Sequence, residues 1–160
     1  VAAGAAPPRR PTPAPATSGR GAAAAAPAPP PAMDGCVVTG EWLQRNLGAV
    51  KVLDASWYMP ALGRSGLEEY RQRRLPGALF LDIDGIKDTA SPLPHMLPPA
   101  GAFCAAAAAI GVVPTDAVVL YDGAGLFSAA RGRWMLKAFG HTGPVAVLQG
   151  GLPLWVAEGR

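Results

Sequence analysis

The sequence is poor in charged residues, aromatic residues and cysteine, and it has no long apolar run. Charged residues make up 16% of the chain and aromatic residues 7%, and its two cysteines are Cys36 and Cys104. Two distant cysteines form neither a close metal-type pair nor a disulfide-rich pattern. No apolar run is long enough to cross a bilayer. These absences argue against a disulfide-stabilised scaffold, a cysteine metal centre and a membrane partner.

Acidic residues are absent from the first 32 positions, which are mostly Ala and Pro and carry three arginines. Such a stretch has too little apolar bulk to offset its ordering entropy. We therefore predict a disordered tail over residues 1–34 and one folded domain over residues 35–160. The basic, acid-free composition suits an organelle transit peptide, which would direct the protein to the mitochondrial or plastid matrix. Without such a peptide the expected location is the cytoplasm. A Pro/Ala-rich linker or a low-complexity segment fits equally well.

The net charge of +3 belongs to this tail, because the remaining basic residues equal the 11 acidic ones in number. A domain without formal charge, and without a clustered Lys/Arg face, lacks the electrostatic footprint of a nucleic-acid-binding protein. The high isoelectric point of the chain therefore does not indicate a nucleic-acid partner.

Short apolar segments alternate with helical patterns in the rest of the chain. Strands are predicted at 50–53, 78–81, 117–121 and 145–148, with helices at 41–47, from 65, at 103–110, from 128 and at 152–158. In the helix from 65, Glu69 is placed to pair with Arg73. The helix from 128 is expected to have Ala130, Trp134 and Ala138 along one apolar face. The alternation predicts an α/β fold with a parallel sheet covered on both faces.

Several polar residues fall at or just past the ends of these strands. In parallel sheets, ligands gather at the carboxyl ends of the strands. The residues concerned are Asp54, Asp82, Asp84, Asp122 and Gln149.

Neither cysteine is predicted to be a nucleophile. Cys36 lies at the junction of tail and domain with no glycine-rich loop after it. Cys104 lies in an Ala-rich helix, where a small buried hydrophobe is the expected role.

Seven short phrases occur in a fixed order from about residue 37 to the end of the chain. They are Leu53-Asp-Ala-Ser-Trp-Tyr58, Leu75-Pro-Gly-Ala78, Leu81-Asp-Ile-Asp84, Ser91-Pro-Leu-Pro-His-Met-Leu-Pro98, Tyr121-Asp-Gly123, Phe127-Ser-Ala-Ala-Arg131 and Phe139-Gly-His141. Together they resemble the first, non-catalytic domain of the thiosulfate/3-mercaptopyruvate sulfurtransferase family, within the rhodanese superfamily. The resemblance implies a rhodanese-like fold.

Members of that family pair two rhodanese folds and carry the catalytic cysteine in a loop of the second. The matching loop here begins with Asp122, which cannot accept a sulfane sulfur. A thiolate in such a loop is stabilised by a helix amino terminus and backbone N–H groups. Around Asp122 we expect those donors to bind nothing useful. The resemblance implies as partners a second rhodanese domain missing from this chain, a small-molecule sulfur donor, and a thiol or cyanide acceptor, with no cofactor and no metal.

The resemblance also implies auxiliary roles for four residues. Asp84 and His95 match a pair proposed as proton-transfer partners of the cysteine, and their presence together favours 3-mercaptopyruvate over thiosulfate as donor. The structural alternative is that Asp84 caps the next element and His95 fastens the proline-rich crossing. Trp57 and Phe127 match aromatic residues of the substrate cleft, although core packing is an equally good explanation.

Three residues of the helix from 128 are interpreted structurally. Arg131 is expected to pair with Asp54 or Asp82 rather than to bind substrate. Gly132 and Arg133 depart from the family pattern, where a small apolar residue and a tryptophan are usual. A glycine inside a helix is less favourable than alanine by roughly 1 kcal/mol, so this change is expected to loosen the helix.

Two functions follow from the sequence. In the first, the chain is a truncated part of a full sulfurtransferase, and has no activity alone. In the second, it is a catalytically inactive single rhodanese module that acts as a binding or regulatory domain. A phosphatase activity is excluded because it too requires a cysteine where Asp122 stands.

Overall fold

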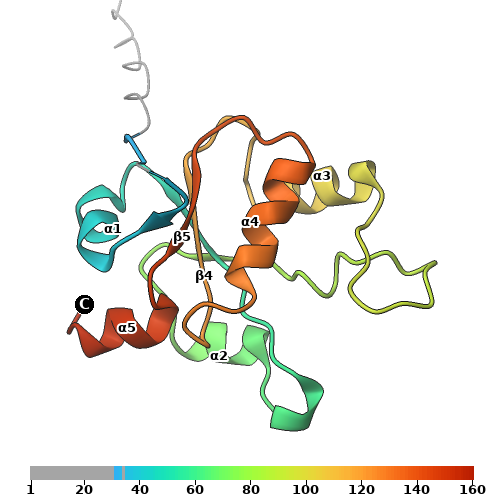
Figure 1. Ribbon diagram of the computed structural model, residues 1–160, viewed down its shortest axis with the longest axis horizontal. Helices are drawn as coiled ribbons and strands as arrows, with labels where there is room; N and C mark the ends of the chain where they lie inside the picture. The colour runs from blue at the N-terminus through green and yellow to red at the C-terminus, as the bar shows by residue number, and fades with distance from the viewer. Residues whose placement is uncertain (1–30, 34) are drawn as a thin grey trace, which may run out of the picture.

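The computed structural model describes residues 31–33 and 35–160, so the predicted disorder of the tail falls almost wholly outside the described residues. Figure 1 shows the arrangement of the elements. In chain order they are β1 (Val37–Val38), α1 (Gly40–Asn46), β2 (Lys51–Asp54), the 3-10 turn η1 (Pro60–Leu62), α2 (Gly66–Gln72), β3 (Leu79–Phe80), α3 (Ala100–Ala109), β4 (Val118–Tyr121), α4 (Ala129–Ala138), β5 (Val145–Leu148) and α5 (Gly151–Ala157).

The five strands form one sheet in the order β1-β5-β4-β2-β3, and every neighbouring pair is parallel. The predicted α/β fold and its parallel sheet are confirmed. The edge strand β1 was not predicted, because two residues are too few to show a hydrophobic period. All five strands end at the same edge of the sheet, which is where the polar residues of the sequence analysis lie.

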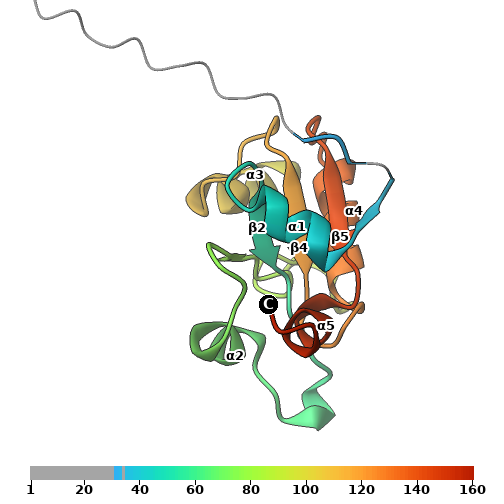
Figure 2. The ribbon, with the colours of Figure 1, turned by 90° about the vertical axis from the view of Figure 1, so that its left-hand side faces the viewer.

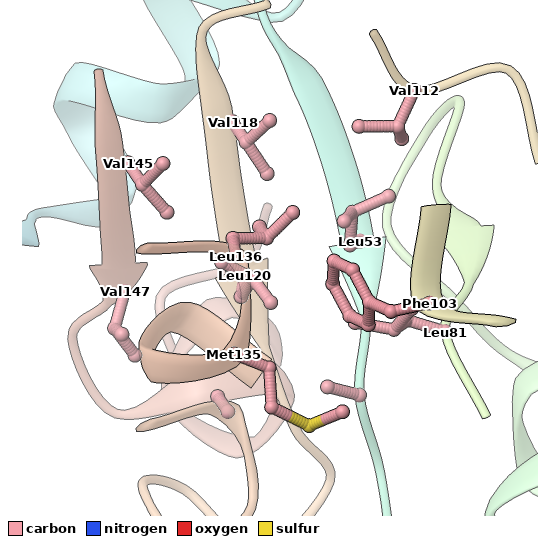
Figure 3. Close-up of a cluster of buried hydrophobic side chains, with 12 residues drawn as sticks. Leu53, Leu81, Phe103, Val112, Val118, Leu120, Met135, Leu136, Val145 and Val147 are labelled. Atoms are coloured by element: carbon pink, nitrogen blue, oxygen red, sulfur yellow. The ribbon is translucent and has the colours of Figure 1, made fainter. Parts of the chain in front are cut away.

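The sheet is covered on both faces because its strands are apolar on both sides. Along β4, Val118 and Leu120 point into one core and Val119 and Tyr121 into the other. Helices α3 and α4 cover the first core, in which Phe103 contributes from α3 (Figure 3). Helices α1 and α5 lie on the opposite face (Figures 1 and 2).

Helix α4 packs on the sheet through a face that was not the predicted one. Its buried residues are Ala129, Gly132, Met135 and Leu136, whereas Ala130, Trp134 and Ala138 are exposed. The prediction was wrong because the helix has apolar residues on two sides, and its sequence alone does not identify which side faces the sheet.

Gly132 lets α4 approach the sheet closely rather than loosening it. A Cβ at this position would lie 2.6 Å from Cδ2 of Leu120 and 3.4 Å from Cβ of Ala55. The glycine therefore has a packing role that offsets its lower helix propensity.

Two other local predictions were also wrong. Cys104 is exposed rather than buried, because α3 is apolar around its whole circumference and it is Phe103 that enters the core. Glu69 pairs with Arg64, at 2.7 Å between Oε1 and Nε, and not with Arg73, since α2 ends before Arg73.

Among the residues that the structure describes, no helix is long and apolar enough to cross a membrane.

Candidate active site

Three loops build the polar edge of the sheet: residues 55–58 after β2, 81–99 after β3 and 122–128 after β4. They differ in burial. Asp54 and Asp122 are each 1% exposed, whereas the side chain of Asp84 is 36% exposed. Of the other two predicted residues, Asp82 accepts a hydrogen bond from Gly85 N through Oδ1, and Gln149 is exposed.

Asp122 fills the loop that follows β4 with its own carboxylate. Oδ1 accepts hydrogen bonds from Ala124 N at 3.0 Å and Gly125 N at 2.8 Å. Oδ2 accepts from Phe127 N at 2.7 Å and Ala129 N at 2.9 Å, at the start of α4. The expectation that these donors bind nothing useful was wrong. The loop keeps an anion-binding arrangement of N–H groups, and an internal anion occupies it.

The loops after β2 and β4 interlock. Ser56 Oγ accepts a hydrogen bond from Gly123 N at 2.9 Å, and Ser128 Oγ accepts one from Trp57 N at 3.1 Å. A Cβ at Gly123 would lie 2.0 Å from the Tyr58 hydroxyl, so only glycine fits there. These contacts fix the backbone that carries Trp57.

Asp54 is a structural residue of this edge. Its Oδ1 accepts a hydrogen bond from Ser56 N at 2.9 Å. Burial raises the pKa of Asp54, hydrogen bonds from Ser56 and Tyr121 oppose that rise, and the charge of Asp122 adds to it. Burial, together with the neighbouring Asp54, also raises the pKa of Tyr121. Both groups face inward and hold the strand ends together.

Asp84 and His95 form a contact in the loop after β3. Asp84 Oδ1 lies 2.9 Å from His95 Nδ1 and 3.1 Å from Lys87 Nζ. The His95 side chain is 44% exposed, and its Nε2 has no hydrogen-bond partner among the described residues. The structure thus brings the two predicted residues together. It adds Lys87, which was not predicted, because a spacing of three residues indicates a pair only on a helix and residues 84–87 are not helical.

Trp57 and Phe127 form aromatic walls beside His95. The edge of the His95 ring meets Trp57 at 4.7 Å between centroids, and Trp57 stacks with Phe127 at 6.2 Å. A cavity of about 180 Å³ lies here, lined by Trp57, Ile83, His95, Phe127, Ser128 and Arg131. Pockets for drug-sized ligands occupy roughly 300 Å³ or more, so this cavity suits a molecule of a few heavy atoms.

Arg131 does not pair with Asp54 or Asp82, and that prediction was wrong. Its Nη2 donates to the His95 carbonyl oxygen at 2.7 Å, and its guanidinium lies 4.6 Å above the Trp134 ring. The Asp54 carboxylate is enclosed at the strand ends, out of reach of a side chain that points along α4.

A second cluster, Arg64, Glu69 and Tyr58, supports the loop after β2 from outside. Arg64 lies 3.7 Å above the Tyr58 ring and donates two hydrogen bonds to Glu69, each 2.7 Å. Tyr58 donates to Glu69 Oε2 at 2.8 Å. Burial and the Glu69 hydrogen bond raise the pKa of Tyr58 to about 12, and Arg64 lowers the pKa of Glu69. The sequence analysis missed this cluster because Arg64 precedes the helix that carries Glu69.

Within residues 31–33 and 35–160, no group of three or more His, Cys, Asp or Glu residues is arranged to hold a metal ion. The chemical groups that the edge of the sheet offers are therefore a carboxylate, an imidazole, two cations and aromatic walls. Such a set can bind a small anion and move a proton.

Comparison with known proteins gives concordant results. Residues 39–158 match the family model for the rhodanese-like domain. The chain is 53% identical over 125 residues to thiosulfate/3-mercaptopyruvate sulfurtransferase 2 of Arabidopsis thaliana, covering 77% of this chain and 36% of that protein. It is 42% identical over 136 residues to human 3-mercaptopyruvate sulfurtransferase, covering 80% and 46%.

Among solved structures, the 3-mercaptopyruvate sulfotransferase SseA of Escherichia coli matches with a TM-score of 0.74 at 36% identity. The match covers 78% of this chain and 48% of that one. The chain thus spans between about a third and a half of the length of these relatives. The fold, the family model and the sequence identities agree, and the chain belongs to the family of rhodanese-like domains.

Proposed function

We propose that this chain is the amino-terminal domain of a thiosulfate/3-mercaptopyruvate sulfurtransferase, in which Asp84 and His95 move protons for a persulfide-forming cysteine in a second rhodanese domain. The observation that carries the proposal is the 2.9 Å contact of Asp84 Oδ1 with His95 Nδ1 at an aromatic cavity. The relatives named above are sulfurtransferases, and this chain offers Asp122 where a nucleophilic cysteine would be needed.

The two sulfur donors make different demands on a proton-transfer group. With 3-mercaptopyruvate, a cysteine thiolate attacks the donor sulfur, the carbon–sulfur bond breaks, and the products are a cysteine persulfide and pyruvate. The proton of the donor thiol must leave sulfur, and the carbon that loses sulfur must gain a proton to become the methyl group. With thiosulfate, the sulfur–sulfur bond breaks and sulfite leaves without any net proton transfer. A histidine that carries a proton between two atoms therefore helps the first reaction.

The geometry around His95 suits that task. Asp84 at Nδ1 favours the tautomer that carries its proton on Nδ1, and this leaves Nε2 to accept a proton. Once Nε2 has accepted a proton, the same ring can return it in the next step. Trp57 and Phe127 line the cavity beside the ring and reduce the access of water to it.

The test joins this chain to a catalytic rhodanese domain and compares the two donors. His95→Ala should lower turnover with 3-mercaptopyruvate by about 10²-fold or more, the range for loss of a general acid–base group. Turnover with thiosulfate should change little, which makes that donor the internal control, and circular dichroism checks the fold. Equal losses with both donors, or no loss with either, would rule out His95 as the proton carrier.

We also propose that residues 1–34 act as a mitochondrial transit peptide. Its support is the basic, acid-free composition and a 52% identical relative from Arabidopsis thaliana that is named as mitochondrial. Residues 1–34, placed after an initiator methionine and fused to a fluorescent protein, should direct it to mitochondria. A variant with Arg9, Arg10 and Arg20 changed to glutamine should not enter. Cytosolic fluorescence from the unmodified fusion would contradict the assignment.

A further inference from the structure

We propose that Arg131 is a positioning residue that holds His95 in the orientation that meets Asp84. The use of that orientation in catalysis rests on the proposed function, but the positioning itself does not. The direct observation is the 2.7 Å hydrogen bond that Arg131 Nη2 donates to the backbone carbonyl of His95.

The backbone of His95 needs such a support. Its φ of 57° makes it the one non-glycine residue with positive φ in the described part of the chain. An L-residue with a Cβ is disfavoured in this left-handed region, so contacts from the surrounding structure have to hold His95 there. His95 also lies in a crossing without a regular element, between β3 and α3. Without an anchor, the residue would be expected to relax to a negative φ and carry its ring elsewhere.

Three segments converge on this one residue. Arg131 from α4 holds the carbonyl, Asp84 from the start of the crossing meets Nδ1, and Trp57 from the loop after β2 packs on the ring. The charged groups around the ring are thus Asp84, its neighbour Lys87, and Arg131. Of these three contacts, the one from Arg131 is made to the His95 backbone, which sets where the ring can meet Asp84 and Trp57. The next residue, Met96, is held by the hydrogen bond that its carbonyl accepts from Asp88 N at 2.9 Å.

Arg131 is itself held on a rigid support. Its guanidinium stacks over Trp134 one turn further along α4. The first turn of α4 is fixed by the hydrogen bond from Ala129 N to Asp122, and Gly132 packs directly against the sheet. Arg131 therefore connects the backbone of His95 to the packed core of the domain.

The experiment measures the ring tautomer of His95 in the full 160-residue chain by nitrogen-15 NMR, at a pH high enough to keep imidazole neutral. In the unmodified chain the Nδ1–H form should predominate. The side chain in Arg131→Gln is two atoms shorter, so its amide should not reach the His95 carbonyl. The hydrogen bond from His95 to the Asp84 carboxylate should then be lost, and the ratio of the Nδ1–H to the Nε2–H form should fall by about tenfold. Arg131→Lys keeps a donor at this position and should restore part of the ratio.

Arg133→Gln is the matched control. Arg133 lies on the same helix and also donates to a backbone carbonyl, but to that of Val145 in β5, at 3.0 Å, and not to that of His95. It should leave the tautomer ratio unchanged. If Arg131→Gln lowers the melting temperature but preserves the ratio, Arg131 is merely structural and the inference is wrong. If the ratio changes while His95→Ala leaves 3-mercaptopyruvate turnover intact in the joined enzyme, the inference stands and the proposed function fails.

Discussion

Asp122 and Asp84 lie at the same edge of the sheet, and their surroundings are opposite in kind. The Asp122 carboxylate is buried, and four backbone N–H groups use both of its oxygens. The Asp84 side chain is 36% exposed, and its Oδ1 is shared between an imidazole and an ammonium group. Asp122, whose two carboxylate oxygens both accept backbone hydrogen bonds, stabilises the loop. Asp84, in contrast, contacts the side chains of His95 and Lys87 and is partly open to solvent.

The largest effect expected from this contrast is on stability. Asp122→Ala would leave four N–H groups without an acceptor, so we expect a loss of about 3 kcal/mol or more in the free energy of unfolding, measured by urea titration. Asp122→Asn retains one acceptor oxygen and should lose less. Asp84→Ala should change the same quantity by under about 1 kcal/mol, as is usual for an exposed ion pair.

Asp116→Ala gives a matched control for the number of hydrogen bonds, because the Asp116 carboxylate accepts a single one, from Val113 N at 2.8 Å. If Asp116→Ala and Asp122→Ala lower the free energy of unfolding equally, the four hydrogen bonds to Asp122 stabilise the domain no more than a single one does.

The next effect is smaller and concerns what can enter the loop after β4. In Asp122→Ala the N–H groups should be open to an external anion, as at other backbone anion sites. Thiosulfate or sulfate at about ten times its dissociation constant should then recover roughly 1.4 kcal/mol of stability, and the unmodified chain should gain much less. Thermal melts with chloride at matched ionic strength separate site binding from a general salt effect. An equal shift in both proteins would show that the loop cannot exchange its internal anion for a free one.

The smallest effect concerns Glu69, a third carboxylate, whose side chain is as exposed as that of Asp84. The hydrogen bonds from Arg64 lower the pKa of Glu69 below its ordinary value of 4.5, with Tyr58 adding to the effect. Folding therefore weakens proton binding, so the stabilisation is complete above that ordinary value and is lost as the pH falls through the lower value of the folded state. The side chain is 36% exposed, so the contribution is below about 1 kcal/mol.

Urea titration of the unmodified chain and of Glu69→Gln checks this expectation. The two proteins should differ most at about pH 6, and the difference should shrink as the pH falls below the ordinary pKa of 4.5. A difference that is constant with pH would assign the effect to packing on Tyr58 rather than to charge.

Much of the fold could be predicted because apolar runs and breaker residues lie in the local sequence. The segments of β2, β4 and β5 and the start of the helix at residue 65 are of this kind, and the structure has Ser65 as the cap of that helix, with Glu68 N donating to Ser65 Oγ. The buried faces of α3 and α4 could not be predicted, since both helices have apolar residues on more than one side. Which face is buried depends on neighbours distant in sequence.

Part of the candidate site could likewise be predicted from the sequence, and part could not. The sequence places Asp84, His95 and Trp57 at strand ends or in the crossing, and the resemblance groups them, but the partner of Arg131 could not be derived from either. A side chain that binds a backbone carbonyl 36 residues away leaves no pattern of residue types, since every residue has a carbonyl. The filling of the loop by Asp122 was missed for a related reason. The donors are main-chain groups, and their orientation follows from the turn and not from side-chain identity.

The pairing of β1 with β5 has a consequence for how the chain folds during synthesis. Val37 and Val38 near the start of the domain pair with Val147 and Leu148 near its end. The edge strand therefore cannot dock until almost the whole domain has left the ribosome, and until then β1 has no strand to pair with. Non-local parallel pairing of this kind is slow and leaves aggregation-prone surface open. Nascent chains arrested before β5 should accordingly depend on chaperones for as long as translation pauses there.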